Sequence, residues 1–233
     1  MNCAVMQPAF LPWAGYFNLM SQVDHFIFLD DVQLEKQSWQ TRNRLLMNGS
    51  AQWISLPIKH NKLSQSISET EFLDTGRWCE KLAKGFKQNY GKHGHYTEVQ
   101  NILDLLTFHR GEKLSDLNEK VIRYMAAKLE ITAHLHRAGE LGVVGVRSAR
   151  LISLCEHVGA KEYLSPVGSA GYLFEDGFEE NLKTRLRFQE YSPQKYNQKG
   201  SNEFVSHLSI VDVIANLGWD GARQYIVKGC FDE

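Results

Sequence analysis

Apolar and polar positions give the front of the chain an α/β pattern. The run CAVMQ at 3–7 is apolar on both faces, which is typical of a central strand in a covered sheet. Apolar residues then recur at helical spacing through 15–24, and HFIFLDDVQ at 25–33 is aromatic and β-branched. Strand, turn, helix and strand within about 30 residues predict a βαβ unit with a parallel strand pair.

A hairpin is expected next. The polar segment 34–50 leads into a short strand, and Asn48-Gly49 is a strong hairpin signal. The returning strand is predicted at 52–58, and Pro57 marks its end or an edge position. Weak alternation predicts a further strand near 66–73.

The middle of the chain has helical periodicity. Helices are predicted at 77–90, 96–108 and 113–131, with Ser115 as the N-cap of the last one. A strand and loop at 133–142 and a helix at 148–160 follow. Gly159 is the expected C′ residue of that helix.

Alternating strands and helices return at the back. Residues 161–173 predict a strand entering a Gly/Ser/Pro turn, and 184–191 alternates like a strand. A helix is expected at 207–218, with Ser209 and Asp212 as a capping box and Gly218 as its stop. We therefore expect an α/β fold, with a mostly parallel Rossmann-like sheet flanked by helices and a helical insertion in the middle of the chain. With no clear linker, residues 1–233 are expected to form a single domain, with a helical subdomain at about 77–130.

Composition narrows the function classes. The 233 residues are 43% hydrophobic and 23% charged, with a formal charge of −1, as in an ordinary soluble globule. Without a global positive field, we expect no nucleic-acid partner. The four cysteines are far apart, which excludes a zinc ribbon or redox motif and favours a cytoplasmic, reducing location. We expect neither a signal peptide nor a membrane span.

The turn after the first strand carries unusual aromatic mass. Pro8 and Pro12 stiffen it, and Gly15 allows close backbone approach. Trp13 and Tyr16 lie in the same turn. Because ligands bind outside the carboxyl ends of parallel strands, we expect the turn to wall a site for a small-molecule substrate. Aromatic residues that simply cap a core are the alternative.

Charged side chains follow the second strand. Asp30 and Asp31 are adjacent, so their carboxylates point to opposite faces and do not form an acid–base pair. One suits a hydroxyl, an ammonium group or a metal, and a turn after the strand is the alternative. Arg42 and Arg44 share a face of an extended segment and suit phosphate or carboxylate. A solvated hairpin face is the alternative there.

The turn at 163–173 is the last candidate. Ser165, Gly168 and Gly171 follow a strand and resemble an anion-gripping turn with exposed N–H groups, although an ordinary glycine loop fits equally well. The pairs His93/His95 and His134/His136 lack a carboxylate or cysteine at good spacing. We therefore assign no metal site.

The string QPAFLPWAGYFNLMSQVDHFIFLDDVQLEKQSWQTRNRL resembles the N-terminal signature of the WbqC-like protein family. GAKEYLSPVGSAGYL and LSIVDVIANLG resemble its later blocks, so the similarity spans nearly the whole chain. The segment 192–198 departs from the family, which tends to have His-Pro before the tyrosine. The matched positions are Gln7, Pro8, Trp13, Gly15, Tyr16, Asp24, Asp31, Trp39, Arg42, Asn43, Ser165, Gly168, Tyr172, Asp212 and Asn216.

The resemblance implies a role in surface-polysaccharide or O-antigen biosynthesis, in which an acyl or aminoacyl group is added to an amino sugar. A weaker likeness links Trp13–Tyr16 to the HxGH turn of nucleotidylyltransferases, with both histidines replaced. That likeness suggests a nucleotide in the crevice, but without the imidazoles plain nucleotidyl transfer is not expected.

The leading hypothesis is an acyl or aminoacyl transferase acting on a sugar nucleotide or amino-sugar precursor. Trp13 and Tyr16 would stack on base or sugar, and Arg42 and Arg44 would hold phosphate. Pro8, Gly15, Trp39, Ser165, Gly168 and Tyr172 complete the expected binding set. Asp31, Gln7 and Asn43 are the expected catalytic group, with Asp31 orienting a hydroxyl or amine. The alternative is a nucleotide- or sugar-binding partner of a glycan-biosynthesis enzyme, without chemistry of its own.

Overall fold

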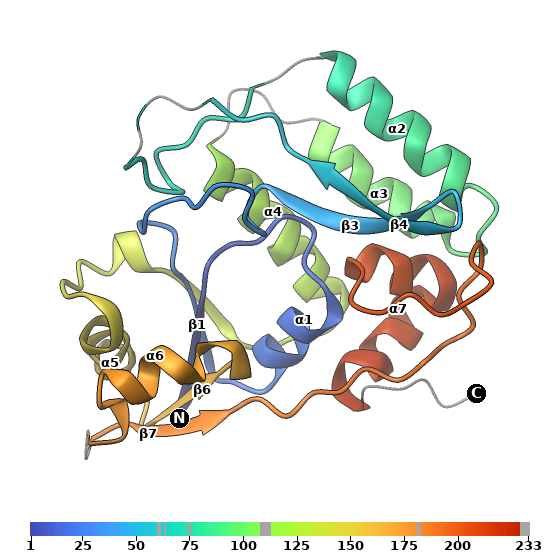
Figure 1. Ribbon diagram of the computed structural model, residues 1–233. Coiled ribbons are helices and arrows are strands. Elements are labelled where there is room, and N and C mark those ends of the chain that lie inside the picture. The colour runs from blue at the N-terminus through green and yellow to red at the C-terminus, as the bar shows by residue number, and fades with distance from the viewer. Residues whose placement is uncertain (60–61, 63, 74–75, 108–112, 181–182, 229–233) are drawn as a thin grey trace.

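The computed structural model describes residues 1–59, 62, 64–73, 76–107, 113–180 and 183–228 (Figure 1). Its strands are β1 (Asn2–Met6), β2 (His25–Phe28), β3 (Arg42–Met47), β4 (Ser50–Ser55), β5 (His134–Arg137), β6 (Glu162–Ser165) and β7 (Arg185–Phe188). Its helices are α1 (Ala14–Ser21), α2 (Gly76–Tyr90), α3 (Tyr96–Thr107), α4 (Leu114–Lys128), α5 (Arg147–His157), α6 (Ala170–Glu175) and α7 (Ile210–Lys228). Short 3₁₀ turns lie at Ala138–Glu140, Val167–Ser169 and Phe178–Glu180.

The main sheet contains strands from both ends of the chain. Within the described residues its order is β5-β2-β1-β6-β7, and every neighbouring pair is parallel. The expected α/β class and the shared parallel sheet are confirmed. The predicted βαβ unit is also present, because β1 pairs in parallel with β2 and α1 lies between them in sequence.

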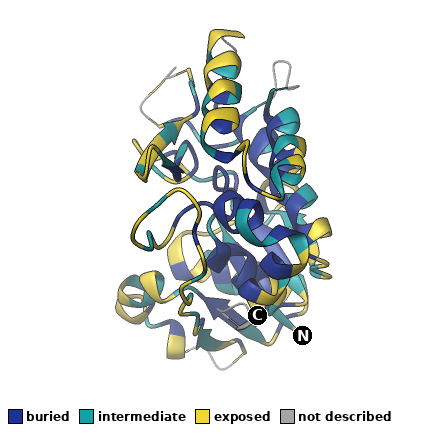
Figure 2. Cartoon of the chain, turned by 90° about the vertical axis from the view of Figure 1, so that its right-hand side faces the viewer, coloured by how far each residue is buried: buried dark blue, intermediate teal, exposed yellow. Residues whose placement is uncertain are grey.

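Alternating residues of the central strands bury two different faces. Ala4, Phe26 and Phe28 join the cluster built by α1, α4 and α7. Val5 and Ile27 join a second cluster with α5. Figure 2 shows the buried positions gathered inside and the exposed ones on the outer sides of helices and loops. Burial on both faces explains the continuous apolar runs of β1 and β2.

The strand order reverses direction between β1 and β6. Helix α1 follows β1 on one face of the sheet, whereas α5 precedes β6 on the other face. In an open parallel sheet, such a reversal leaves a crevice outside the carboxyl ends of the two strands. The topology therefore predicts a ligand-binding crevice at the carboxyl ends of β1 and β6.

The predicted hairpin is an antiparallel pair, β3–β4. Asn48 and Gly49 both have positive φ (53° and 78°), as a type I′ turn requires. The Leu46 amide donates to the Tyr90 hydroxyl (3.0 Å), and that hydroxyl donates to Asp212 of α7 (3.2 Å). Burial raises the pKa of Asp212. This chain of hydrogen bonds ties the hairpin to α2 and α7.

Several local predictions are wrong. Residues 66–73 form isolated bridges instead of a strand, because the Glu69 carboxylate accepts from the Ser66 amide (3.0 Å) and closes a turn. Ser115 lies inside α4, whose N-cap is Lys113. The last residue of the predicted helix 96–108 lies outside the described residues.

The helix start at Ser209 is confirmed, since its hydroxyl accepts from the Val211 amide (3.3 Å). The Asp212 side chain, however, does not accept from the Ser209 amide, because that amide donates to the Arg44 carbonyl (2.9 Å). Gly218 interrupts the helical backbone with φ 68°, but the helix resumes after it. The capping box is therefore half formed, and the predicted stop is a kink.

Three histidines meet where β2 pairs with β5. His25 Nδ1 lies 3.0 Å from His136 Nε2, and the rings of His25 and His134 stack at 5.4 Å. Burial lowers the pKa of His136 below its ordinary 6.5, and His25, His134, Arg123 and His157 lower it further. His136 is therefore disposed to remain neutral in the folded chain.

This cluster predicts a pH dependence of stability. Because folded His136 binds a proton less readily than the unfolded chain does, its contribution is present above about pH 6.5 and lost as the pH falls through the lower folded pKa. From about pH 7.5 to about pH 5, the free energy of unfolding should fall more steeply for the wild-type chain than for His136→Gln. Urea unfolding at the two pH values checks this, and parallel pH profiles would contradict it.

Candidate functional site

The turn that leaves β1 is held by the hairpin segment. The Asn43 carboxamide donates to the carbonyls of Phe10 (3.0 Å) and Leu11 (2.8 Å). The Phe10 amide donates in turn to the Trp39 carbonyl (2.8 Å). Asn43 is buried, and its own oxygen accepts from the Arg44 amide (2.8 Å). The turn and the hairpin segment thus form one unit, although Phe10 and Trp39 lie 29 positions apart in sequence.

Gly15 allows the Trp13 ring to fold back over the first turn of α1. A methyl group built at Gly15 would overlap the Trp13 indole. The indole also packs 4.9 Å from the His207 ring and 5.7 Å from the Tyr191 ring, between centroids. Glycine is therefore needed here for close approach and not for an unusual backbone angle.

A cavity of about 690 Å³ lies between this turn, the hairpin and the carboxyl ends of β1 and β6. Its volume falls within the range of small-molecule sites. Most of its lining is apolar or aromatic. The lining residues are Val5, Met6, Gln7, Ala9, Pro12, Trp13, Tyr16, Leu29, Trp39, Gln40, Asn43, Arg44, Leu151, Tyr163, Pro166, Gly168, Ser169, Tyr172 and His207.

Two glutamines supply much of the cavity's hydrogen-bonding capacity. The Gln40 amide nitrogen donates to the Gln7 side-chain oxygen. The Gln40 oxygen is buried and has no partner within the described part of the chain. Asn118 fixes the backbone around both, donating to the carbonyls of Pro8 (2.9 Å) and Gln40 (2.8 Å). An unpaired acceptor beside a cavity is suited to a ligand N–H or O–H group.

Three tyrosines line the same cavity. The Tyr16 hydroxyl donates to the Gln7 carbonyl (3.2 Å). Burial raises the pKa of Tyr16 and Tyr163 well above the ordinary value, and it also raises the pKa of Tyr172. At neutral pH these phenols stay protonated and serve as hydrogen-bond donors or apolar walls, not as bases.

Two exposed tryptophans and two half-buried arginines lie together at the rim. Trp39 and Trp53 are each about half exposed, with ring centroids 5.3 Å apart. The Arg42 guanidinium lies 4.2 Å from the Trp53 ring centroid. Arg44 donates to the His207 carbonyl (3.1 Å). The Nε atoms of both arginines are buried without a partner among the described residues.

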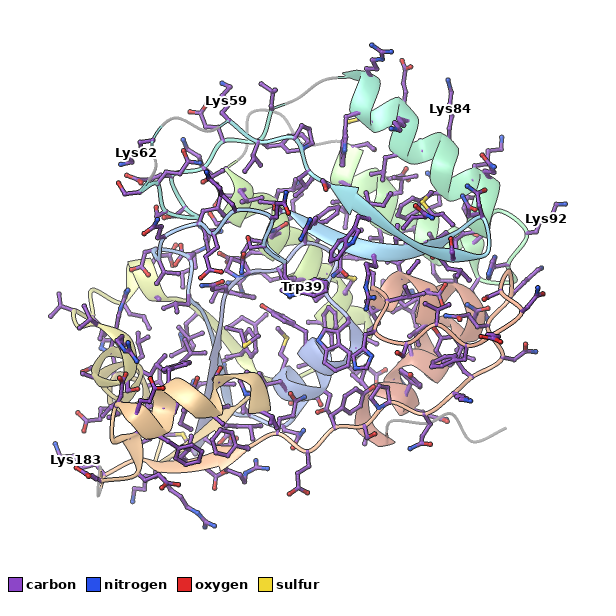
Figure 3. All side chains as sticks on the ribbon, viewed as in Figure 1. Trp39, Lys59, Lys62, Lys84, Lys92 and Lys183 are labelled. Carbon is purple, nitrogen blue, oxygen red and sulfur yellow. The ribbon has the colours of Figure 1, made fainter. Side chains whose placement is uncertain are left out.

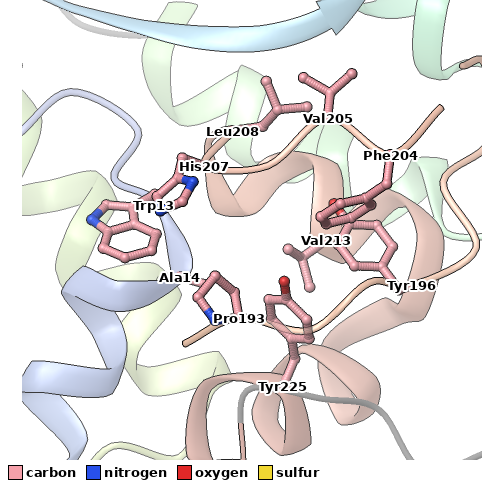
Figure 4. A pocket seen from close by; sticks show the side chains of 10 residues that line it. All are labelled: Trp13, Ala14, Pro193, Tyr196, Phe204, Val205, His207, Leu208, Val213 and Tyr225. Atoms are coloured by element: carbon pink, nitrogen blue, oxygen red, sulfur yellow. The ribbon is translucent and has the colours of Figure 1, made fainter. Parts of the chain in front are cut away.

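His207 is a strained residue in the cavity wall. Its φ of 56° is left-handed, a conformation that histidine adopts more readily than most side chains but that still carries a cost. Trp13 and His207 also border a small hollow of about 10 Å³ on their other side (Figure 4). Residues of the 193–213 segment and Tyr225 fill that side and hold the two rings in place.

The paired aspartates lie away from the cavity lining. Asp31 forms an ion pair with Arg150 of α5. Asp30 accepts from the Gly139 amide (3.1 Å), and burial raises the pKa of Asp30. Both carboxylates thus bind the chain itself.

The expected site residues divide into two groups. Those that line the cavity are Gln7, Trp13, Tyr16, Trp39, Asn43, Arg44, Gly168 and Tyr172. Those that do not are Pro8, Gly15, Asp31, Arg42 and Ser165. Ser165 is buried and donates to the Pro166 carbonyl (3.3 Å), and Arg42 stacks on Trp53.

Sequence reasoning missed Gln40 and His207. Gln40 directly follows Trp39 in the motif SWQTRNR, so the motif around it was the sequence feature that could have identified it as a site residue. His207 was expected to open the helix 207–218, whereas in the structure it lies in the loop before α7, which begins at Ile210.

Two further observations concern metal binding and membrane spanning. No three His, Cys, Asp or Glu side chains within the described ranges are placed to hold one metal ion. Across the same ranges, every helix is too short or too polar to cross a lipid bilayer.

A matched pair of glycine substitutions tests the packing of Trp13. Alanine ordinarily stabilises a helix by about 0.5 to 1 kcal/mol relative to glycine. Gly15→Ala should instead lower the free energy of unfolding by about 1 to 3 kcal/mol, because the indole must move. Gly171→Ala in α6 is the control, since an added methyl group would meet nothing within 4 Å. Urea unfolding measures both, and stabilisation by Gly15→Ala would contradict the packing.

Comparison with known proteins agrees with the extent of the sequence motifs. The profile of the WbqC-like protein family matches residues 7–224, which include nearly all of the cavity lining. The "Uncharacterized protein Rv1507c" of Mycobacterium tuberculosis is 29% identical over 217 residues, covering 92% of this chain and 93% of that protein. No solved structure is significantly similar to the chain. The chain belongs to the WbqC-like protein family.

Proposed function

We propose that this protein transfers an acyl or aminoacyl group to the amine of an amino sugar, carried as a sugar nucleotide or related precursor, in surface-polysaccharide (O-antigen) biosynthesis. The observation that carries the proposal is the cavity at the β1–β6 crevice. It is largely apolar, has an unpaired acceptor at Gln40, and has arginines and tryptophans at its rim. These features match a ligand with a sugar, a hydrogen-bond donor and a phosphate.

In the proposed binding mode, each part of the ligand contacts a different part of the cavity or its rim. The sugar lies in the cavity against Trp13 and Tyr16, and its amine faces the Gln7–Gln40 pair. Trp39 at the rim stacks on the base, as an exposed indole can. Phosphate oxygens pair with Arg44, and Arg42 extends the same positive edge.

The proposed chemistry is attack of the neutral amine on an activated acyl carbonyl. The donor is a thioester or ester. The C–N bond forms, the bond from the carbonyl carbon to the leaving sulfur or oxygen breaks, and the amine proton goes to His207 and then to the leaving group. His207 is the proposed general base because it is the one imidazole that lines the cavity in the described chain. Gln7 orients the amine, and Tyr163 and Tyr172 serve as neutral donors.

Asn43 and Asp31 have indirect roles in this proposal. Asn43 uses its donors and its oxygen on the main chain, so it positions the turn. Asp31 acts through Arg150, which anchors α5 beside the crevice. Pro8, Gly15 and Ser165 likewise shape the cavity without touching the ligand.

A binding partner without chemistry is the second candidate. It is favoured by one observation, that no carboxylate of the described chain lines the cavity. In that case the cavity would present or sequester a sugar nucleotide for another enzyme.

His207→Asn separates the two candidates, because asparagine tolerates the left-handed backbone but cannot act as the base. For the transferase, turnover should fall by about 100- to 10,000-fold while ligand affinity stays within a few-fold. The ligand is first found by thermal shift with sugar nucleotides and acyl donors, where a ligand at 100 times its Kd adds about 2.7 kcal/mol. Turnover by His207→Asn at the wild-type rate would reject the base. Ligand binding without turnover in any donor–acceptor combination would favour the binding partner.

The arginines and Asp31 provide a further test. Arg44→Ala and Arg42→Ala should weaken binding of a phosphate-bearing ligand, with the larger effect from Arg44 because it lines the cavity. Asp31→Asn should cost about 1 to 3 kcal/mol of stability by leaving Arg150 without its carboxylate. Urea unfolding and ligand titration measure these effects. A stable Asp31→Asn protein with lost turnover would instead make Asp31 a catalytic residue.

A further inference from the structure

Strand β4 has an open edge. Two residues of the neighbouring strand β3, Arg44 and Leu46, turn main-chain groups away from β4. The Arg44 carbonyl accepts from the Ser209 amide, and the Leu46 amide donates to the Tyr90 hydroxyl. In an antiparallel pair, the residues opposite them point outward on the other strand. These are Trp53 and Ala51. Neither amide has a partner within the described residues, so β4 offers free main-chain groups.

Helix α2 lies over the hairpin and encloses with it a groove of about 920 Å³, whose lining includes Gln52, Trp53, Ile54 and Ser55 of β4. The Trp78 indole donates to the Ser55 carbonyl (2.9 Å), and the Asn89 side chain accepts from the Asn48 amide (2.8 Å). The helix is therefore fixed along the hairpin in the opposite direction to β4, as Figure 1 shows. An extended segment added to the open edge of β4 would lie next to this groove and to the helix that walls it.

The helical wall of the groove is basic. Arg77, Lys81 and Lys84 line it and are exposed, against the single carboxylate of Glu80 in the same lining. Figure 3 shows Lys84 standing on α2. The whole chain has a formal charge of −1, so this wall is a local positive field in a nearly neutral protein. Its electrostatic complement is an acidic segment.

The sequence of β4 lacks the residues that usually protect an edge. Edges are commonly blocked by lysine or proline. Residues 50–55, SAQWIS, contain neither lysine nor proline, and Trp53 is 47% exposed. A second copy of the chain is a poor occupant, because edge-to-edge pairing would bring two basic helices together.

We propose that the β4 edge and α2 bind an extended acidic segment of a partner protein, which adds as a third strand to the hairpin. Main-chain hydrogen bonds to Ala51 and Trp53 fix the segment, and its carboxylates face Lys81 and Lys84. The Trp53 ring packs against Trp39 of the cavity rim, so the partner is held next to the cavity mouth. The proposal does not depend on the cavity being a transferase site.

The test uses the intact chain and two short peptides of alternating residues, one of glutamate and valine and one of lysine and valine. Amide NMR shifts and hydrogen exchange are followed during titration. The glutamate peptide should bind at least about tenfold more tightly, a difference of about 1.4 kcal/mol. It should protect the Ala51 and Trp53 amides from exchange.

Two variant pairs locate the binding. Lys81→Glu combined with Lys84→Glu should reverse the peptide preference. Lys161→Glu combined with Lys195→Glu is the control, with the same charge change at exposed positions outside the groove lining. Ala51→Pro removes an outward amide without breaking the β3 ladder and should weaken binding by about tenfold or more, whereas Ala51→Val should not.

Three results would overturn the proposal. They are no saturable binding of the glutamate peptide, equal binding of both peptides, and binding that leaves the Ala51 and Trp53 amides unprotected. Concentration-dependent dimerisation through this edge, measured by light scattering, would also overturn it in favour of a second copy.

Discussion

The carboxamide of Asn43 is the constraint on which the site depends. It donates to two successive carbonyls of the turn after β1 and accepts from the backbone of its own strand. Within the described residues, β3 pairs with β4 alone, so no strand pairing of the main sheet joins the hairpin to that turn. A buried polar group with every hydrogen bond made specifies one arrangement, since any other leaves carbonyls unpaired. The opening between turn and hairpin therefore has a fixed shape.

This arrangement produces a site with few charged side chains. The sheet supplies an apolar floor, the turn supplies Trp13 and Tyr16, and the hairpin supplies Arg44 at the rim. Burial keeps the phenols neutral, and the aspartates of the β2 end are occupied elsewhere. Such a cavity suits a ligand held by shape, stacking and directed hydrogen bonds. In the transfer that we propose, the donor is already activated, so one imidazole would suffice as the base.

Features encoded locally could be predicted from sequence. The β1 run, the Asn48-Gly49 turn and the Gly159 helix end depend on neighbours within a few residues, and the structure has each of them. Pairings between distant segments could not be predicted. Asp31 pairs with Arg150, which lies 119 positions away in sequence. Asp212 was expected in a capping box, but its carboxylate accepts from Tyr90 and Gln198 instead. His207 is positioned by Trp13 and Arg44, which no pattern near position 207 reveals.

Hydrogen exchange in Asn43→Asp tests the central constraint most directly. A carboxylate cannot donate to the Phe10 and Leu11 carbonyls, so the turn should separate from the hairpin. The account predicts that the Phe10 amide, bonded to the Trp39 carbonyl, loses protection, while the Leu29 amide, bonded to Met6 at the end of the β1–β2 ladder, keeps it. Unchanged protection at Phe10 in a folded Asn43→Asp protein would contradict it.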